Sequence, residues 1–280
     1  NNGASISSTQ FGFTEGKSTV DAWKAVVNHV RSCPSKYILG LFIDFSGAFD
    51  NISWNSILRR LVEIGSRDLK LWESYFSGRK VIMEGNTQSI TRGVSRGCPQ
   101  GSICRPYIWN LDTLLRRLNE NGVICVVYAD DLLIMVDANS RLGIERKGNE
   151  SMEIVRDWAT NVSLAVSEEK SVCMLLKGIL SETRPPWVKN GNKNLPYKKT
   201  TEYIGITISE RLGFLPHFQE LRLRLIKITG QFKRDLRKRW GPSLATVRSW
   251  WGGLFSSIVV YGAEVWYREV DKGYIRKAID

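Results

Sequence analysis

Four short apolar runs stand out along the chain, and each has the length and the β-branched or aromatic character of a buried strand. They span residues 37–43, 123–127, 132–136 and 203–208. The second and third runs are separated only by Tyr-Ala-Asp-Asp at 128–131, which predicts a hairpin with two adjacent carboxylates at its bend. Residues 162–176 predict one or two further strands, with Lys170 among them.

Helical periodicity fills most of the chain between these strands. The pattern predicts helices at about 19–32, 53–65, 68–77, 103–119, within 139–160, at 216–239 and at 242–260. Ser18 followed by Asp21 is a capping-box pattern at the start of the first helix, and Pro34 ends that helix. Two more short strands, 79–84 and 88–94, flank a Gly-Asn turn.

This mixture of strands and helices predicts an α+β fold, in which an antiparallel sheet packs on helices.

Two stretches interrupt the pattern of strands and helices. Residues 95–102 form a Gly/Pro-rich loop that opens onto a helix, which is a place where backbone amides can hold phosphate, although most such loops are only turns. Residues 178–198 contain three prolines and predict an irregular linker.

Composition narrows the class of protein. The chain has 280 residues and 42% of them are apolar, which suffices for a core and for one or two domains. No apolar run reaches the ~18 residues that a membrane span needs, and the first residues lack the pattern of a secretory signal. Five cysteines without a Cys-x-x-Cys pair, and only two histidines, argue against a structural zinc site and favour a reducing compartment.

The chain is strongly basic, with a net charge of +12 at pH 7. This favours a polyanionic partner, nucleic acid first and an anionic membrane second. Residues 211–240 hold nine Lys and Arg against two acidic residues. A charge run is usually a solvated helix face, but this excess favours a surface that binds phosphates. We take as candidate nucleic-acid contacts Arg222, Arg224, Lys233, Arg234, Arg237 and Lys238.

Three aspartates lie where predicted buried strands end. Asp44 follows the run 37–43, and Asp130 and Asp131 lie at the bend between two others, so antiparallel pairing would bring the three together. Close carboxylates cannot all ionise without compensation, and hard divalent cations take carboxylate oxygens. Two cations about 3.5–4 Å apart would form a phosphoryl-transfer centre. Taken alone, the Asp-Asp pair is equally compatible with a hairpin tip carrying two solvated aspartates.

Three motifs, in this order and spacing, resemble the palm of a reverse transcriptase. They are Phe-Ile-Asp-Phe-Ser-Gly-Ala-Phe-Asp at 42–50, Gly-Cys-Pro-Gln-Gly-Ser at 97–102 and Tyr-Ala-Asp-Asp at 128–131. Further matches at 11–13, 170 and 203–205 are typical of the non-LTR (LINE-type) retrotransposon branch. The stretches 46–51, 203–240 and 261–266 most resemble the arthropod clade that inserts into ribosomal RNA genes. The resemblance covers about residues 10–267.

The resemblance implies metal-binding and proton-transfer roles. Asp44 and Asp130 would bind two Mg²⁺ ions, with Mn²⁺ as a substitute, and Asp131 would assist. The backbone carbonyl of Phe45 would complete a metal shell. Lys170 would protonate the departing pyrophosphate; considered in isolation, it is more simply explained as a surface lysine.

The resemblance also implies contacts with nucleotide and primer. Phe49 would stack under the sugar and exclude a 2′-hydroxyl, while Gln100 and Gly101 would touch the incoming nucleotide and the template. The strand that contains Tyr203 and Gly205 would grip the primer end. Without the resemblance, Phe49 and Tyr203 would simply be core aromatics.

The same resemblance implies a domain plan, a set of partners and a location. We expect residual fingers at 1–36, a palm at 37–176 with a fingers insertion at about 66–96, a linker and primer-grip strands at 177–210, a helical thumb at 211–268 and a tail at 269–280. The implied partners are template RNA, a DNA primer and deoxynucleoside triphosphates, with no membrane and with the oligomeric state left open. The implied location is intracellular, in the nucleus, where target-primed insertion takes place.

Two departures from the family pattern keep alternatives open. The family's fingers motifs upstream of Phe11 are absent, so we expect a fragment, and Arg105 stands where the family has a small residue. The first hypothesis is an RNA-directed DNA polymerase domain that works by target-primed reverse transcription. The alternative is a catalytically incomplete, nucleic-acid-binding remnant. A third candidate, an RNA-templated RNA polymerase, shares the palm, but a bulky Phe49 argues against it.

Overall fold

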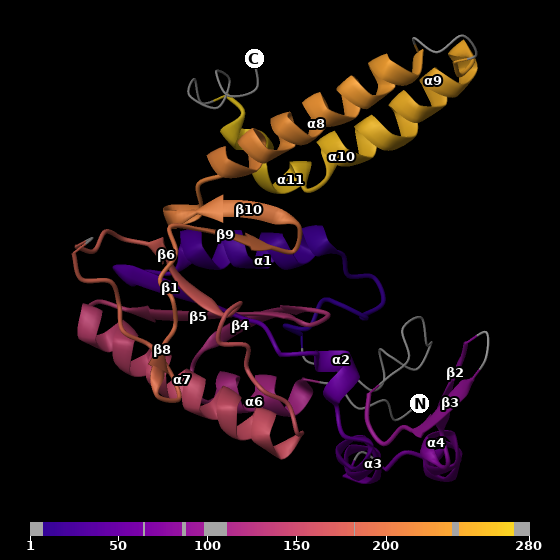
Figure 1. Cartoon of the computed structure of the whole chain (residues 1–280). Helices are drawn as coiled ribbons and strands as arrows, with labels where there is room; N and C mark the ends of the chain where they lie inside the picture. The colour runs from indigo at the N-terminus through magenta and orange to yellow at the C-terminus, as the bar shows by residue number, and fades with distance from the viewer. Residues whose placement is uncertain are drawn as a thin grey trace.

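A four-stranded antiparallel sheet in the order β4–β5–β1–β6 forms the centre of the chain (Figure 1). The computed structural model describes residues 8–63, 65–85, 88–97, 111–181, 183–236 and 241–271. The sheet consists of β1 Tyr37–Ile43, β4 Ile124–Tyr128, β5 Asp131–Ala138 and β6 Val172–Lys177. The predicted strands at 37–43, 123–127 and 132–136 are therefore confirmed, and so is the α+β class.

Helix α1, Thr19–Ser32, begins and ends close to the residues that the sequence predicts. The Ser18 side chain accepts a hydrogen bond from the Asp21 amide, and the Asp21 carboxylate accepts one from the Ser18 amide, so the capping box is present. The apolar stripe of the helix, which includes Trp23 and Val26, is buried. Amphipathic spacing alone thus predicted which face of α1 meets the sheet.

Helices cover both faces of the sheet, which explains why its strands are continuous apolar runs rather than alternating ones. One face packs on α6 Asp112–Glu120 and α7 Arg141–Asn161, and it receives alternate β1 side chains such as Leu41 and Ile43. The opposite face packs on α1, and Phe42 points into that side. Figure 1 shows α6 and α7 below the sheet and α1 above it.

Helices α2 to α4 and a two-stranded hairpin form a separate lobe beside the sheet (Figure 1). Its elements are α2 Ala48–Asn51, α3 Trp54–Glu63, α4 Leu69–Phe76, β2 Lys80–Glu84 and β3 Ser89–Gly93. Trp54 stacks on Phe76 with ring centroids 5.1 Å apart, which joins α3 to α4. The predicted helices and hairpin of this region are confirmed, whereas the short helix α2 was not predicted.

The predicted single strand at 203–208 is wrong, because these residues form a hairpin. Its strands are β9 Thr200–Tyr203 and β10 Ile206–Ser209, paired antiparallel. The backbone reverses at Ile204 and Gly205, which have φ values of 45° and 67°. Two successive positive φ values are typical of a type I′ turn, in which a β-branched residue is rare. The apolar pattern runs through the turn because Ile204 is itself buried.

Two further predictions are corrected between α7 and β9. Lys170 does not belong to a strand: β6 starts at Val172, and Lys170 lies in the turn that precedes it. The predicted linker at 178–198 contains a small hairpin, β7 Lys189–Asn190 and β8 Lys193–Asn194. This segment packs on α7, where a Cβ on Gly148 would lie 2.8 Å from a methyl carbon of Val188.

The C-terminal part of the chain is a pair of long helical stretches connected to β10 by the short helix η1, Glu210–Leu212. The first stretch is α8 Leu215–Leu236. The second runs through α9 Leu244–Trp250, the π-helical turn η2 Trp251–Phe255 and α10 Ser256–Val260, and it leads to α11 Ala263–Trp266 and η3 Tyr267–Glu269. The two predicted helices are confirmed in position, and the π turn was not predicted.

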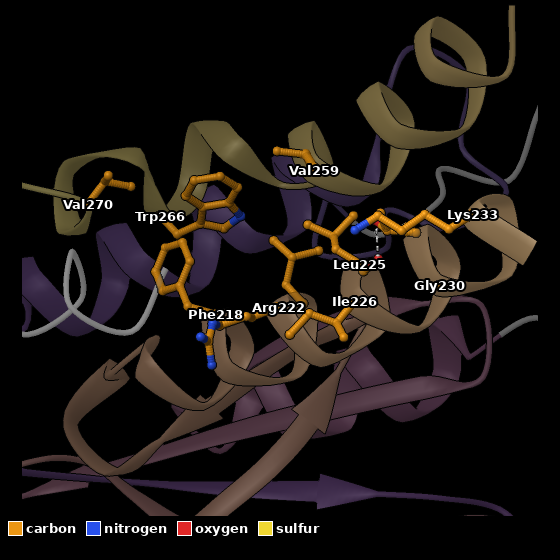
Figure 2. A pocket seen from close by; sticks show the side chains of 11 residues that line it. Phe218, Arg222, Leu225, Ile226, Gly230, Lys233, Val259, Trp266 and Val270 are labelled. Carbon is orange, nitrogen blue, oxygen red and sulfur yellow. Dashed lines mark hydrogen bonds between the residues drawn. The ribbon is translucent and has the colours of Figure 1, made fainter. Parts of the chain in front are cut away.

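An apolar groove of about 700 Å³ separates α8 from α10 and α11. Figure 2 shows Phe218 and Leu225 of α8 facing Trp266 and Val259 across it. The helices meet at the two ends of the groove. Phe218 packs edge-on against Trp266 at 5.0 Å, and Phe232 lies 5.0 Å from Trp250. The helical pair is therefore stabilised by aromatic contacts at both ends.

Several predictions remain untested by the fold. Of the helix expected at 103–119, only residues 111–119 lie within the described part of the chain, and there α6 begins at Asp112. The domain boundaries stay predictions as well. None of the helices in the described part of the chain is long and apolar enough to cross a membrane.

Candidate active site

The strand register brings Asp44 and Asp131 together. Ile43 of β1 pairs with Leu132 of β5, and the two strands are antiparallel. One residue further along β1 and one residue back along β5, Asp44 therefore lies across from Asp131. Successive side chains alternate between the faces of a sheet. Asp44 therefore shares the face of Phe42, and Asp131 shares the face of Leu133, which is the face covered by α1. Asp130 is the last residue of the turn between β4 and β5.

A cavity of about 470 Å³ opens beside these carboxylates. Asp44 and Asp131 line it from the sheet, and Lys170 lines it from the turn before β6. The Lys170 Nζ lies 4.0 Å from the Asp44 Oδ2, with 73% and 37% of the two side chains exposed. An ion pair this exposed contributes at most about 1 kcal/mol, so Lys170 does not neutralise Asp44 permanently.

Burial and neighbouring carboxylates both disfavour negative charge on the aspartates of the cavity. The pKa of Asp131 is raised to about 6: burial is the largest cause, and repulsion from the charges of Asp130, Asp44 and Glu202 contributes in decreasing order. Burial also raises the pKa of Asp44; the Lys170 ammonium opposes this rise and Asp130 adds to it. Facing carboxylates across a strand pair are destabilising unless a cation compensates them.

The donor set fits a hard divalent cation, although it does not form a closed cage. Among the residues that the structure describes, no three His, Cys, Asp or Glu side chains are grouped closely enough to hold a metal ion. Mg²⁺, however, usually takes only one or two protein carboxylates and completes its octahedron with water and substrate phosphates. Asp44 and Asp131, which share one cavity and repel each other, meet that requirement.

An N-terminal segment supports the β4–β5 hairpin from outside the sheet. The Phe11 amide donates to the Val127 carbonyl at 2.8 Å, and the Val127 amide donates to the Thr9 carbonyl at 3.1 Å. Gly12 lies against the turn itself: a Cβ there would be 2.1 Å from the amide nitrogen of Ala129. The structure thus gives Gly12 a packing role that the sequence motif alone did not reveal.

Two of the predicted aromatic residues, Phe45 and Tyr203, lie in the core. Phe45 is 4% exposed and packs edge-on against Trp158 at 5.6 Å. Tyr203 is 3% exposed, and its hydroxyl donates to the Val126 carbonyl at 2.9 Å. Burial raises the pKa of Tyr203, with the charge of Asp131 as the second cause. The residues of this hairpin that line the cavity include Tyr203, Ile204 and Gly205.

The remaining predicted residues divide into two groups. Arg222, Arg224, Lys233 and Arg234 are exposed on α8, and Figure 2 shows Arg222 and Lys233 beside the apolar groove. Gln100, Gly101, Arg237 and Lys238 lie outside the described residues, as does the side chain of Phe49.

Three charged residues of the cavity were not singled out from the sequence. Glu169, Lys198 and Glu202 line it together with Asp44. Glu202 and Lys198 precede Tyr203 by one and five positions. Recognition of β9 as a separate strand would have pointed to residues just before Tyr203 as candidates for the lining of the cavity.

An antiparallel sheet with aspartates at adjoining strand ends, covered by helices and flanked by a helical pair, defines the palm of a template-directed polymerase. The family described as “Reverse transcriptase (RNA-dependent DNA polymerase)” matches residues 2–208, and the chain belongs to that family. The fold is also similar to that of apo telomerase from Candida tropicalis truncated from its C-terminal domain. That match has a TM-score of 0.51 and 10% identity, and it covers 73% of this chain and 40% of that one.

Relatives with curated descriptions confirm the predicted branch of the family. The chain is 44% identical over 260 residues to the “Putative 115 kDa protein in type-1 retrotransposable element R1DM” of Drosophila melanogaster, covering 92% of this chain and 25% of that protein. It is 41% identical over 271 residues to the “Retrovirus-related Pol polyprotein from type-1 retrotransposable element R1” of Bradysia coprophila, covering 96% and 27%. The chain thus spans about a quarter of the length of these relatives.

Proposed function

We propose that this chain extends a DNA primer on an RNA template, using deoxynucleoside triphosphates and two Mg²⁺ ions, in the nucleus and by target-primed reverse transcription. The observation that carries the proposal is one cavity lined by Asp44, Asp131 and Lys170 at the edge of a reverse transcriptase palm. Template RNA, DNA primer and nucleotide are the partners expected for it.

The three aspartates, Lys170 and the hairpin turn would divide the work; Asp44 and Asp131 line the cavity, whereas Asp130 is exposed in the turn before β5. Asp44, Asp130 and Asp131 would hold the metal ions, which when bound supply charge neutralisation and lower the pKa of an attacking hydroxyl. Lys170 Nζ would donate a proton to the departing pyrophosphate oxygen, a position consistent with its 4.0 Å separation from Asp44 Oδ2. The Ile204–Gly205 turn would carry the primer end toward the aspartates from the opposite wall. Catalysis here is mainly placement and charge stabilisation.

Primer extension tests the proposal directly. The chain should extend a labelled DNA primer on an RNA template with Mg²⁺ and deoxynucleotides, and Asp130→Ala should not. Extension by Asp130→Ala at the rate of the unmodified chain would refute the assigned chemistry. Template–primer binding without any extension by either protein would instead favour the catalytically incomplete remnant.

Sugar discrimination tests the role proposed for Phe49. The chain should incorporate deoxyribonucleotides in preference to ribonucleotides, and Phe49→Val should reduce that preference about 10-fold or more, because a smaller side chain leaves room for a 2′-hydroxyl. Single-nucleotide incorporation of each type by both proteins provides the measurement. Equal use of the two sugars by the unmodified chain would point to an RNA polymerase.

Salt dependence tests the basic face of α8. Replacement of Arg222, Arg224 and Arg234 by glutamine should lower the slope of log K against log salt concentration by about 2 to 3, because each lost phosphate contact removes about 0.9 of slope on duplex DNA. Fluorescence anisotropy on a labelled duplex between 50 and 200 mM salt, roughly the range over which such contacts are resolved, measures it. Arg146→Gln, an exposed arginine on α7, is the matched control. An unchanged slope in the triple variant would remove α8 from the interface.

A further inference from the structure

The tip of the β9–β10 hairpin is held by one residue of the C-terminal helical unit, Tyr261. Its hydroxyl donates to the Ile204 carbonyl at 3.0 Å. Its ring also covers Gly205, where a Cβ would lie 3.1 Å from the Tyr261 Cε1. Ile204 and Gly205, which both line the cavity, are therefore in contact with a side chain 57 and 56 positions away along the chain.

Tyr261 is itself fixed in place. The Trp266 Nε1 donates to the Tyr261 carbonyl at 3.0 Å. Gly262, with φ of 67°, packs so closely on the hairpin that a Cβ there would lie 2.5 Å from the Ile206 Cδ1. Trp266 also contacts Phe218 at the start of α8. Tyr261 thus belongs to the aromatic end of the helical pair rather than to a free surface loop.

The turn that Tyr261 contacts is strained. Ile204 has φ of 45°, a conformation that is unfavourable for a β-branched residue and persists only where the surroundings impose it. On one side the turn is attached to the palm, because the Tyr203 hydroxyl donates a hydrogen bond to the Val126 carbonyl. On the other side are the helices, through Tyr261 and through a 2.5 Å hydrogen bond from the Thr207 hydroxyl to Glu220 of α8.

We propose that Tyr261 is a positioning residue, which sets the Ile204–Gly205 turn at the mouth of the catalytic cavity and so fixes where the primer end lies relative to Asp44 and Asp131. This inference rests on the proposed polymerase function for its effect on primer. Tyr261 contacts Ile204, and the hydroxyl of the adjacent Tyr203 donates to the Val126 carbonyl on β4, the strand that leads into the Asp-Asp turn. The position of the helical pair is thereby linked to that strand. Tyr261 itself does not line the cavity and has no chemical role.

Two substitutions separate the hydrogen bond from the ring packing. Tyr261→Phe removes only the hydroxyl, and Tyr261→Ala removes the ring that covers Gly205. Loss of one hydrogen bond of this kind corresponds to a change of about 2- to 10-fold. Tyr261→Phe should therefore raise the KM for primer–template about 2- to 10-fold with kcat and the KM for deoxynucleotide unchanged. Tyr261→Ala should raise the primer–template KM further, and the phenylalanine variant should lie between the alanine variant and the unmodified chain.

Three measurements make the test decisive. They are steady-state extension, anisotropy binding of a labelled primer–template, and hydrogen exchange of the amides at 203–207, all on the full 280-residue chain. Tyr267→Phe is the matched control, because Tyr267 is an exposed tyrosine on η3 whose hydroxyl accepts a hydrogen bond from the neighbouring Arg268 Nε. In Tyr261→Phe, exchange at 203–207 should accelerate by the same 2- to 10-fold range, about that expected for one hydrogen bond.

The outcomes distinguish this inference from the proposed function. If the unmodified chain does not extend primer, the proposed function fails; the positioning role then stands or falls on whether Tyr261→Phe weakens primer–template binding. If Tyr261→Phe accelerates exchange but leaves both KM and binding unchanged, the contact is merely structural and the inference is overturned. Unchanged exchange together with unchanged KM would overturn it as well.

Discussion

Primer extension by Asp44→Asn is expected to fall at least about 10³-fold below that of the unmodified chain, because a metal ligand contributes several kcal/mol to the transition state and each 1.36 kcal/mol is a factor of ten. Asparagine keeps the size of the side chain and one oxygen but loses the charge. The loss should therefore appear in kcat with the protein still folded. Single-turnover extension under saturating primer and nucleotide measures it.

The same variant should reveal metal binding without any chemistry. Because the pKa of Asp44 is raised on balance, the folded chain favours a neutral group there, and Asp44→Asn should melt at a higher temperature than the unmodified chain in the absence of divalent cations. Added Mg²⁺ should raise the melting temperature of the unmodified chain, since a ligand that binds only the folded state stabilises it. The melting temperature of Asp44→Asn should rise little when Mg²⁺ is added.

A matched carboxylate provides the control for both readouts. Asp157→Asn, on α7, removes an exposed aspartate whose carboxylate lies 3.9 Å from the Arg117 guanidinium. It should leave extension and the Mg²⁺ response unchanged. An Asp44→Asn protein that gains as much thermal stability from Mg²⁺ as the unmodified chain would show that the metal lies elsewhere. Retained extension would exclude Asp44 as a ligand.

Gly12→Ala is expected to reduce extension about 100-fold and to destabilise the fold by about 1–3 kcal/mol, the usual range for overpacking. The added Cβ would meet only backbone atoms: the Ala129 nitrogen at 2.1 Å and the Tyr128 carbonyl carbon at 2.9 Å. Since backbone cannot rotate away, the turn that carries Asp130 and Asp131 must shift. A displacement of about 1 Å at reacting groups is sufficient for a 100-fold loss.

Two further variants keep this prediction testable if Gly12→Ala folds poorly. Gly93→Ala places its Cβ in open space at the end of β3, so activity and melting temperature should be unchanged. Lys17→Met loosens the same N-terminal segment without a clash, because the Lys17 Nζ donates to the Ser8 and Gln10 carbonyls at 2.6 and 2.9 Å. Full activity in both Gly12→Ala and Lys17→Met would mean that the segment does not position the turn.

The sequence singled out Asp44, Asp131 and Lys170 of the cavity, but not the other charged residues that line it. Asp44, Asp130 and Asp131 were found because they interrupt apolar runs, and a charge at the end of a buried strand is conspicuous in a single sequence. Glu202 and Lys198 were missed because nothing in their local pattern separates them from ordinary surface residues. Their place in the cavity follows from tertiary contacts: the Lys198 amide donates to the Cys173 carbonyl of β6, and Glu202 lies on β9.

By itself the sequence determined the strands of the sheet, the capping box of α1 and the spacing of the polymerase motifs. Each of these depends on periodicity or on neighbours within a few residues, and such interactions are set before the chain is packed. Only the tertiary structure decided that Asp44 faces Asp131, that Gly12 leaves room for the Ala129 amide and that Tyr261 holds the Ile204 carbonyl. These contacts join residues far apart in the chain, so they follow from strand register and side-chain packing, which no local pattern encodes.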